Sequence, residues 1–127
     1  MVRISGPLDD SQLQSAAAEV VSLLATGNFA ILADRFGYAL ARGRDKASAI
    51  EADLAVCLAE IGSRRLVGMD PSSAPLVKHF RQNPSRMHAS VECVAETQSG
   101  GRILVELVVT GSGAERHIGL EQMSVMP

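Results

Sequence analysis

Apolar residues in the first half of the chain recur at three- and four-residue spacings, which is the period of an amphipathic helix. This pattern predicts three helices, the first over Leu8–Ala25, the second over Phe29–Phe36 and the third over Asp45–Ile61. Gly27 follows the first helix, and Asn28 is suited to cap the second. The long first helix and the shorter second helix, on either side of this turn, therefore form a helical hairpin.

From Met87 onward the apolar period changes to two, which is typical of half-buried antiparallel strands. Three strands are predicted, over Met87–Glu96, Arg102–Thr110 and Arg116–Val125. The middle one is apolar on both sides, so we place it at the centre of the sheet. In the last strand the apolar positions switch from even to odd residues, which predicts a β-bulge near Glu121 or Gln122.

The remaining segments have weaker patterns. Residues Tyr38–Ala41 lie between two glycines and fit either a short strand or a further helical turn. A short strand is expected over Arg64–Met69. The proline-containing stretch 70–86 is the least readable part of the chain, and we expect one helical turn within it, around Leu76–Arg81.

Helices followed by an antiparallel meander are the segregated order of an α+β protein. The 127 residues, 46% of them hydrophobic, suffice for one core without metal or disulfide cross-links. We therefore expect a single domain over residues 1–127. In it, the helical stripes Leu13–Leu24 and Ile50–Ile61 pack on one face of the C-terminal sheet.

The charge balance bears on possible partners. The net charge of −2 argues against DNA or RNA as the partner. Residues 35–86 nevertheless carry nine Lys and Arg against five Asp and Glu, and Arg64 and Arg65 are among them, so an acidic partner or an anionic ligand is an alternative. The chain lacks a window approaching the roughly 20 apolar residues of a membrane span. With Cys57 and Cys93 both on apolar faces, a reduced, cytoplasmic protein is expected.

Motifs for several common chemistries are missing from the sequence. The glycine spacing of dinucleotide and phosphate loops does not occur, nor does the Gly-x-Ser-x-Gly turn of a serine nucleophile. The three histidines, His79, His88 and His117, are scattered, and no Cys-x-x-Cys or His-x-x-His pair is present. We therefore expect neither a cofactor nor a metal ion.

One group of polar residues has the composition of an acid–base site. His88, Glu92 and Glu96 share one face of a predicted strand, and Glu106 comes from the same face of its neighbour if the hairpin pairs as expected. A histidine with several carboxylates is able to transfer protons or to hold a cation weakly. A solvated sheet face has the same pattern and is the plainer interpretation.

The order of elements, with the turn Thr26-Gly27-Asn28-Phe29 opening a short second helix, resembles the cystatin-like and nuclear transport factor 2-like superfamily. The resemblance covers Leu8 to Met126 and implies a cone in which helices wrap a curved sheet. Members of that group include isomerases, dehydratases and proteins that dimerise through the sheet. Its enzymes place Asp or His with Tyr inside the cone, and the loose candidates here are Asp34, Tyr38 and His117.

These observations lead to two hypotheses. The first is a non-catalytic protein-interaction or dimerisation module, because Leu104 and Val108 lie on the sheet face opposite the expected core. The alternative is a small-molecule-binding protein or an enzyme of the isomerase or dehydratase type. Under this alternative, the candidates for lining a cavity are Tyr38, His88, Glu92, Glu106 and His117.

Overall fold

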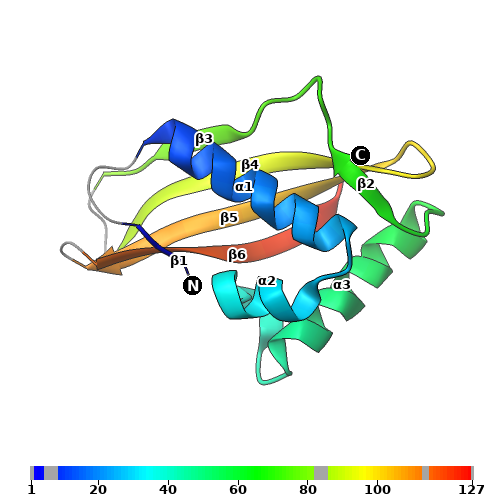
Figure 1. Ribbon diagram of the computed structural model, residues 1–127, viewed down its shortest axis with the longest axis horizontal. Coiled ribbons are helices and arrows are strands. Elements are labelled where there is room, and N and C mark those ends of the chain that lie inside the picture. The colour runs from blue at the N-terminus through cyan, green and yellow to red at the C-terminus, as the bar shows by residue number, and fades with distance from the viewer. Residues whose placement is uncertain (1, 5–8, 82–85, 113–114, 127) are drawn as a thin grey trace.

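Three N-terminal helices pack against a curled antiparallel sheet of six strands in the computed structural model, which describes residues 2–4, 9–81, 86–112 and 115–126 (Figure 1). The three α-helices are α1 (Asp10–Ala25), α2 (Phe29–Phe36) and α3 (Lys46–Glu60), and a short 3-10 helix, η1 (Ala39–Ala41), lies between α2 and α3. The strands are β1 (Val2–Ile4), β2 (Leu66–Met69), β3 (Leu76–His79), β4 (Met87–Thr97), β5 (Arg102–Ser112) and β6 (Glu115–Val125). The expected α+β class is confirmed.

Local polar contacts explain where two of the helices begin. The Asp9 carboxylate accepts a hydrogen bond from the Ser11 amide at the start of α1, and Asp45 accepts one from Ser48 at the start of α3. The first helix was expected to start at Leu8, which lies outside the described residues. Asn28 precedes α2, but its side chain does not cap it and instead donates to the Thr26 hydroxyl.

The three long strands form the predicted meander, with β5 in the middle. The sheet order is β1-β6-β5-β4-β2, and β3 also pairs with β4. Glu106 of β5 faces Gln122 while its neighbour Leu107 faces Leu120, so Glu121 is the extra residue of a β-bulge. The bulge predicted from the switch in apolar positions is therefore confirmed.

The helical turn expected around Leu76–Arg81 is wrong, because residues Leu76–His79 form the edge strand β3. Four of its residues are in register with β4, from Leu76 opposite Glu92 to His79 opposite Ala89. Backbone hydrogen bonding along an available sheet edge outweighs the weak local preference of such a short segment. The structure also resolves the ambiguous Tyr38–Ala41 segment in favour of the helical option.

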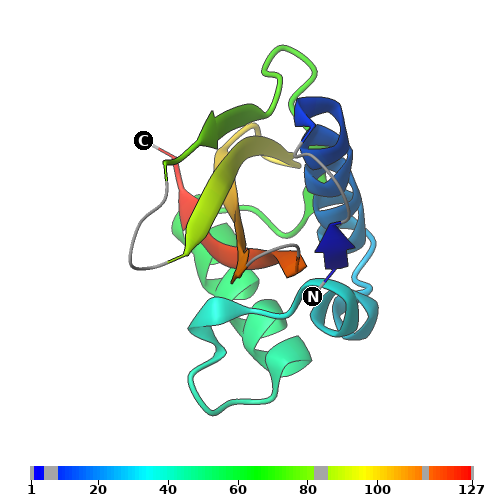
Figure 2. The same cartoon turned by 90° about the vertical axis from the view of Figure 1, so that its left-hand side faces the viewer.

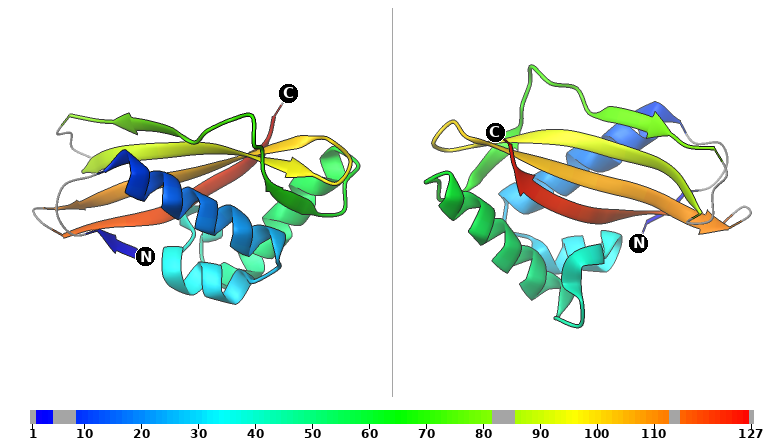
Figure 3. Two further views of the ribbon diagram at one scale, coloured as in Figure 1. Left: turned by 45° about the horizontal axis from the view of Figure 1, so that its top comes forward. Right: turned by 180° about the vertical axis from the view of Figure 1, so that it is seen from behind.

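The core lies between the helices and one face of the sheet. Figures 1 and 2 show α1 lying across this face, while α2 and α3 lie along the β6 side. Its sheet side is formed by Ala89, Val91, Cys93, Ala95, Ile103, Val105, Leu107, Val109, Ile118 and Leu120, all at most 2% exposed. Seen from behind, β4, β5 and β6 have no helix over them in the described part of the chain (Figure 3).

Candidate functional site

The sheet face turned away from the helices is called the open face here. Its outward-pointing residues on β3 to β6 include Leu76, Lys78, Ser90, Glu92, Val94, Leu104, Glu106, Val108, Gln122 and Ser124. Leu104 and Val108 remain partly exposed at its centre, and Leu76 at its edge is 52% exposed. The open face is thus a mixed apolar and acidic surface.

The structure places two of the three carboxylates of the candidate group opposite each other, as expected from the hairpin. Glu92 of β4 is in direct register with Glu106 of β5. Each has its own polar neighbour, since Lys78 Nζ lies 3.4 Å from Glu92 and Gln122 Nε2 donates to Glu106 over 3.0 Å. Glu92 and Glu106 therefore form a cross-strand pair of like charges that is only partly compensated.

Like charges directly opposite on a sheet destabilise it, so Glu106→Gln is expected to raise the free energy of unfolding by about 0.5 kcal/mol. Urea denaturation at low salt measures this change, and the gain should shrink at high salt because salt screens the repulsion. Glu96→Gln is the matched control, because Glu96 lies opposite Arg102 and its loss removes an attraction. An equal gain in both variants would contradict this account.

The two candidate histidines of the sheet do not join these carboxylates. His88 Nε2 lies 2.8 Å from the carbonyl oxygen of Gly111. His117 is on β6, where it is in register with Arg3 of β1 and Thr110 of β5. Within the described ranges, no hydrogen bond or ion pair links His88 to a carboxylate. Among the described residues, the hydrogen bonds of His88 therefore do not join it to the carboxylates of the candidate acid–base group.

Tyr38, the remaining predicted site residue, is buried and takes part in a polar network whose other members, Asp53 and Arg44, are partly exposed. Its hydroxyl donates to Asp53 Oδ2 over 2.6 Å, and the Arg44 guanidinium donates to both oxygens of the same carboxylate at 3.0 Å. Arg44 also donates to the carbonyl oxygens of Leu40 and Ala41. The network ties the η1 segment to α3.

The electrostatics of this network disfavour acid–base chemistry at Tyr38. Burial and the hydrogen bond to Asp53 raise the pKa of the Tyr38 hydroxyl well above its ordinary value. Hydrogen bonds from Arg44 are the largest cause of the lowered pKa of Asp53. Tyr38 thus stays protonated and Asp53 stays ionised near neutral pH, which is the arrangement of a structural contact.

A surface hollow of about 340 Å³ lies where η1 meets the open face. Tyr38 lines it together with Val108 and Thr110, but the lining does not include His88, Glu92 or Glu106. The predicted cavity residues are therefore not gathered around one cavity.

Both cysteines are free and buried, as predicted. Cys57 Sγ donates to the carbonyl oxygen of Met123, and Cys93 Sγ donates to that of Val105. Burial raises the pKa of Cys93 to about 12 and also raises that of Cys57. Neither thiol has the thiolate character that a nucleophile or a metal ligand requires.

Two features are absent from the described part of the chain. No three His, Cys, Asp or Glu side chains come together there in a way that suits a metal ion. None of its helices combines the length and apolarity needed to cross a membrane.

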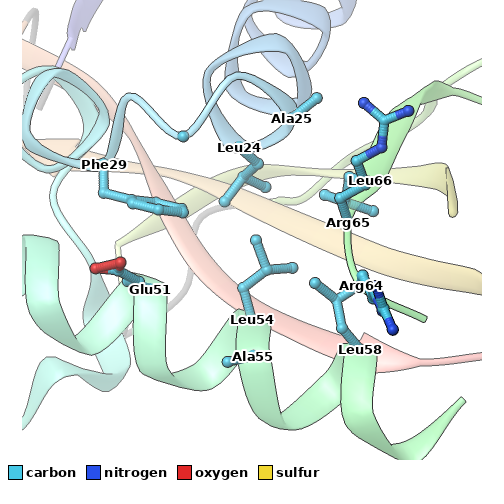
Figure 4. A pocket seen from close by; sticks show the side chains of 11 residues that line it. Leu24, Ala25, Phe29, Glu51, Leu54, Ala55, Leu58, Arg64, Arg65 and Leu66 are labelled. Atoms are coloured by element: carbon cyan, nitrogen blue, oxygen red, sulfur yellow. The ribbon is translucent and has the colours of Figure 1, made fainter. Parts of the chain in front are cut away.

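A different pocket lies on the helical side of the molecule, between the α1–α2 turn, α3 and the start of β2 (Figure 4). Its volume is about 250 Å³. The apolar walls come from Leu24, Phe29, Leu54, Leu58 and Leu66. Figure 4 shows Glu51 beside Phe29 at one end and Arg64 and Arg65 at the other. We call it the arginine-rimmed pocket.

Sequence reasoning recognised parts of this pocket without bringing them together. Leu24, Leu54 and Leu58 belong to the predicted helical stripes, and Arg64 and Arg65 belong to the basic middle of the chain. A stripe pattern shows which side chains turn inward, but not where two helices and a strand leave a gap between them. The basic residues that follow α3 were the available signal.

Comparisons with protein-family models, with curated proteins and with solved structures find no match to this chain. What the structure supports is a small α+β fold with a curled sheet. A shared fold does not specify a function, so function has to be argued from the surfaces of this molecule.

Proposed function

We propose that this protein is a non-catalytic interaction module that forms a homodimer through the open face of its sheet. The observation that carries the proposal is the position of Leu104 and Val108. Both lie on the central strand β5, on the sheet face that the helices leave uncovered, and keep part of their apolar surface exposed. Apolar surface in such a place is stabilised by a partner.

The size of the open face suits a dimer. Strands β4, β5 and β6, of 11 residues each, are about 36 Å long and together span about 14 Å, and the four residues of β3 add a shorter row, which gives an area of about 580 Å². A standard protein–protein interface takes about 800 Å² from each partner. The open face supplies most of this area, so a second copy of the chain stacked sheet on sheet would use nearly all of it.

The resemblance to the cystatin-like and nuclear transport factor 2-like superfamily is part of the same proposal. It is supported by the order of three N-terminal helices followed by a curled antiparallel sheet. The strand β1, which precedes α1 and pairs with β6, was not part of the expected pattern. A cytoplasmic setting is also proposed, with the free, buried thiols of Cys57 and Cys93 in support.

Light scattering coupled to size-exclusion chromatography tests the dimer. The wild-type chain should have twice the mass of a single chain at high micromolar concentration, and the Leu76→Lys, Leu104→Lys double variant should have the mass of one. Val56→Lys is the matched control, because Val56 is 60% exposed on α3, away from the open face. That variant should remain dimeric.

Folding of the double variant is checked by circular dichroism, and Leu76→Lys alone provides a milder test. Leu76 lies opposite Glu92 at the edge of the sheet, so a lysine there is tolerated within the monomer. The proposal predicts weaker dimerisation of this single variant. A wild-type chain that stays monomeric at high micromolar concentration would overturn the proposal.

A further inference from the structure

The arginine-rimmed pocket combines apolar walls with unpaired positive charge. Arg64 and Arg65 are exposed, and neither guanidinium makes a hydrogen bond or ion pair with any residue that the structure describes. Leu24, Leu54 and Leu58 are largely buried and face one another between α1 and α3 (Figure 4). A ligand for this pocket needs an apolar body and an anionic end.

The dimensions limit the ligand to a small molecule. A volume of 250 Å³ lies just below the usual range of about 300–1,000 Å³ for ligand pockets. At about 25–30 Å³ for each non-hydrogen atom, close to the share of liquid volume that one water molecule takes, it holds about eight to ten of them, which is the size of hexanoate to octanoate. The wall along α3 runs from Glu51 to Leu58, a rise of about 10 Å, which matches the length of such a molecule when extended.

The charges at the two ends fix the orientation. Arg64 and Arg65 attract an anion to one end, and a guanidinium matches a carboxylate with two parallel hydrogen bonds. Glu51 at the opposite end repels a second negative charge. A monocarboxylate therefore fits the pocket better than a dicarboxylate of the same length.

We propose that the arginine-rimmed pocket binds a small monocarboxylate with an unbranched apolar tail, of the size of hexanoate to octanoate. The tail lies between the leucines of α1 and α3, and the carboxylate lies at Arg64 and Arg65. The site is separate from the open face, so this inference goes beyond the proposed dimerisation and fails or holds independently of it.

Titration of the isotope-labelled full chain with octanoate, followed by amide NMR and calorimetry, tests the proposal. Octanoate should bind at least about tenfold more tightly than octan-1-ol, octylamine or octanedioate, because only octanoate satisfies both ends. The shifted amides should be those of the pocket. Glu51→Gln should narrow the difference between octanoate and octanedioate.

Substitutions test the arginines and the apolar part of the pocket separately. Arg64→Gln with Arg65→Gln should weaken octanoate binding by about tenfold or more, and Arg42→Gln with Arg86→Gln, which removes the same charge elsewhere, should leave it unchanged. Ala55 lines the pocket from an exposed position on α3. Ala55→Phe should fill the pocket and abolish binding while both arginines remain.

Three results would overturn the proposal. The first is the absence of octanoate binding at millimolar concentration. The second is equal binding of octanoate and inorganic phosphate, which would show an anion site that does not use the apolar walls. The third is a lower melting temperature of the Arg64→Gln, Arg65→Gln variant with unchanged octanoate affinity, which would show that the arginines only stabilise the nearby C-terminal helix ends.

Discussion

Leu107→Ala is expected to lower the free energy of unfolding by about 2–5 kcal/mol, because it opens a cavity at the centre of the core. Leu107 is fully buried on the central strand β5, between Val91 of β4 and Leu120 of β6. These neighbours are held by the sheet register and cannot move far enough to fill the space. Urea denaturation of the dilute protein measures the change.

Leu104→Ala is the matched control, since it deletes the same atoms from the same strand. Leu104 points to the open face and keeps part of its surface in water. In the monomer its truncation should cost less than half as much as that of Leu107, because less apolar contact is lost. Equal costs for the two variants would mean that the core does not lie on the helical side of the sheet.

Asp53→Ala is expected to lower the free energy of unfolding by about 1–3 kcal/mol at neutral pH, because it leaves the buried Tyr38 hydroxyl without its acceptor. The residue Tyr38 is only 6% exposed, so water does not replace Asp53 freely. Tyr38→Phe should cost about 1 kcal/mol or less, since it removes the hydroxyl and keeps the ion pair of Asp53 with Arg44.

The network also makes stability depend on pH. The pKa of Asp53 is lower in the folded chain than its ordinary value of 3.8. Its ionised form therefore stabilises the fold above this value, and the stabilisation is lost as the pH falls through the folded-state pKa. The wild-type chain should be more stable than Asp53→Asn at pH 7, and the difference should shrink toward pH 3. A difference that is constant with pH would contradict the role assigned to the Asp53 charge.

The two proposed surfaces use opposite sides of the molecule. The open face is formed by β3 to β6, and the arginine-rimmed pocket by α1, α3 and the start of β2. A sheet-to-sheet dimer therefore leaves the pocket accessible. Octanoate binding should be the same in the wild-type chain and in the Leu76→Lys variant, which provides a direct check that the two surfaces are independent.

Long segments with a strong period were predictable because burial on one side imposes that period on the sequence. The stripe of α3, the alternation in β4 and the bulge at Glu121 all follow from which residues face the core. The cross-strand pair of Glu92 and Glu106 was predictable for the same reason, since hairpin register brings a fixed pair of residues together.

Short segments were not predictable in this way. Residues Leu76–His79 form a strand only because β4 offers a free edge to pair with, and this edge comes from residues later in the chain. Tyr38 was named as a candidate for catalysis, but its partners Asp53 and Arg44 are brought to it by the packing of η1 on α3. The residues next to Tyr38 in the sequence do not indicate which side chains it contacts in the folded chain.

The order of residues alone therefore determined the α+β class, the orientation of each long element toward the core and the absence of common cofactor motifs. The tertiary structure decided which polar groups meet, where a pocket opens beside Arg64 and Arg65, and which sheet face stays uncovered. The physical reason is that periodicity depends on interactions along one element, whereas sites arise where elements far apart in sequence pack together.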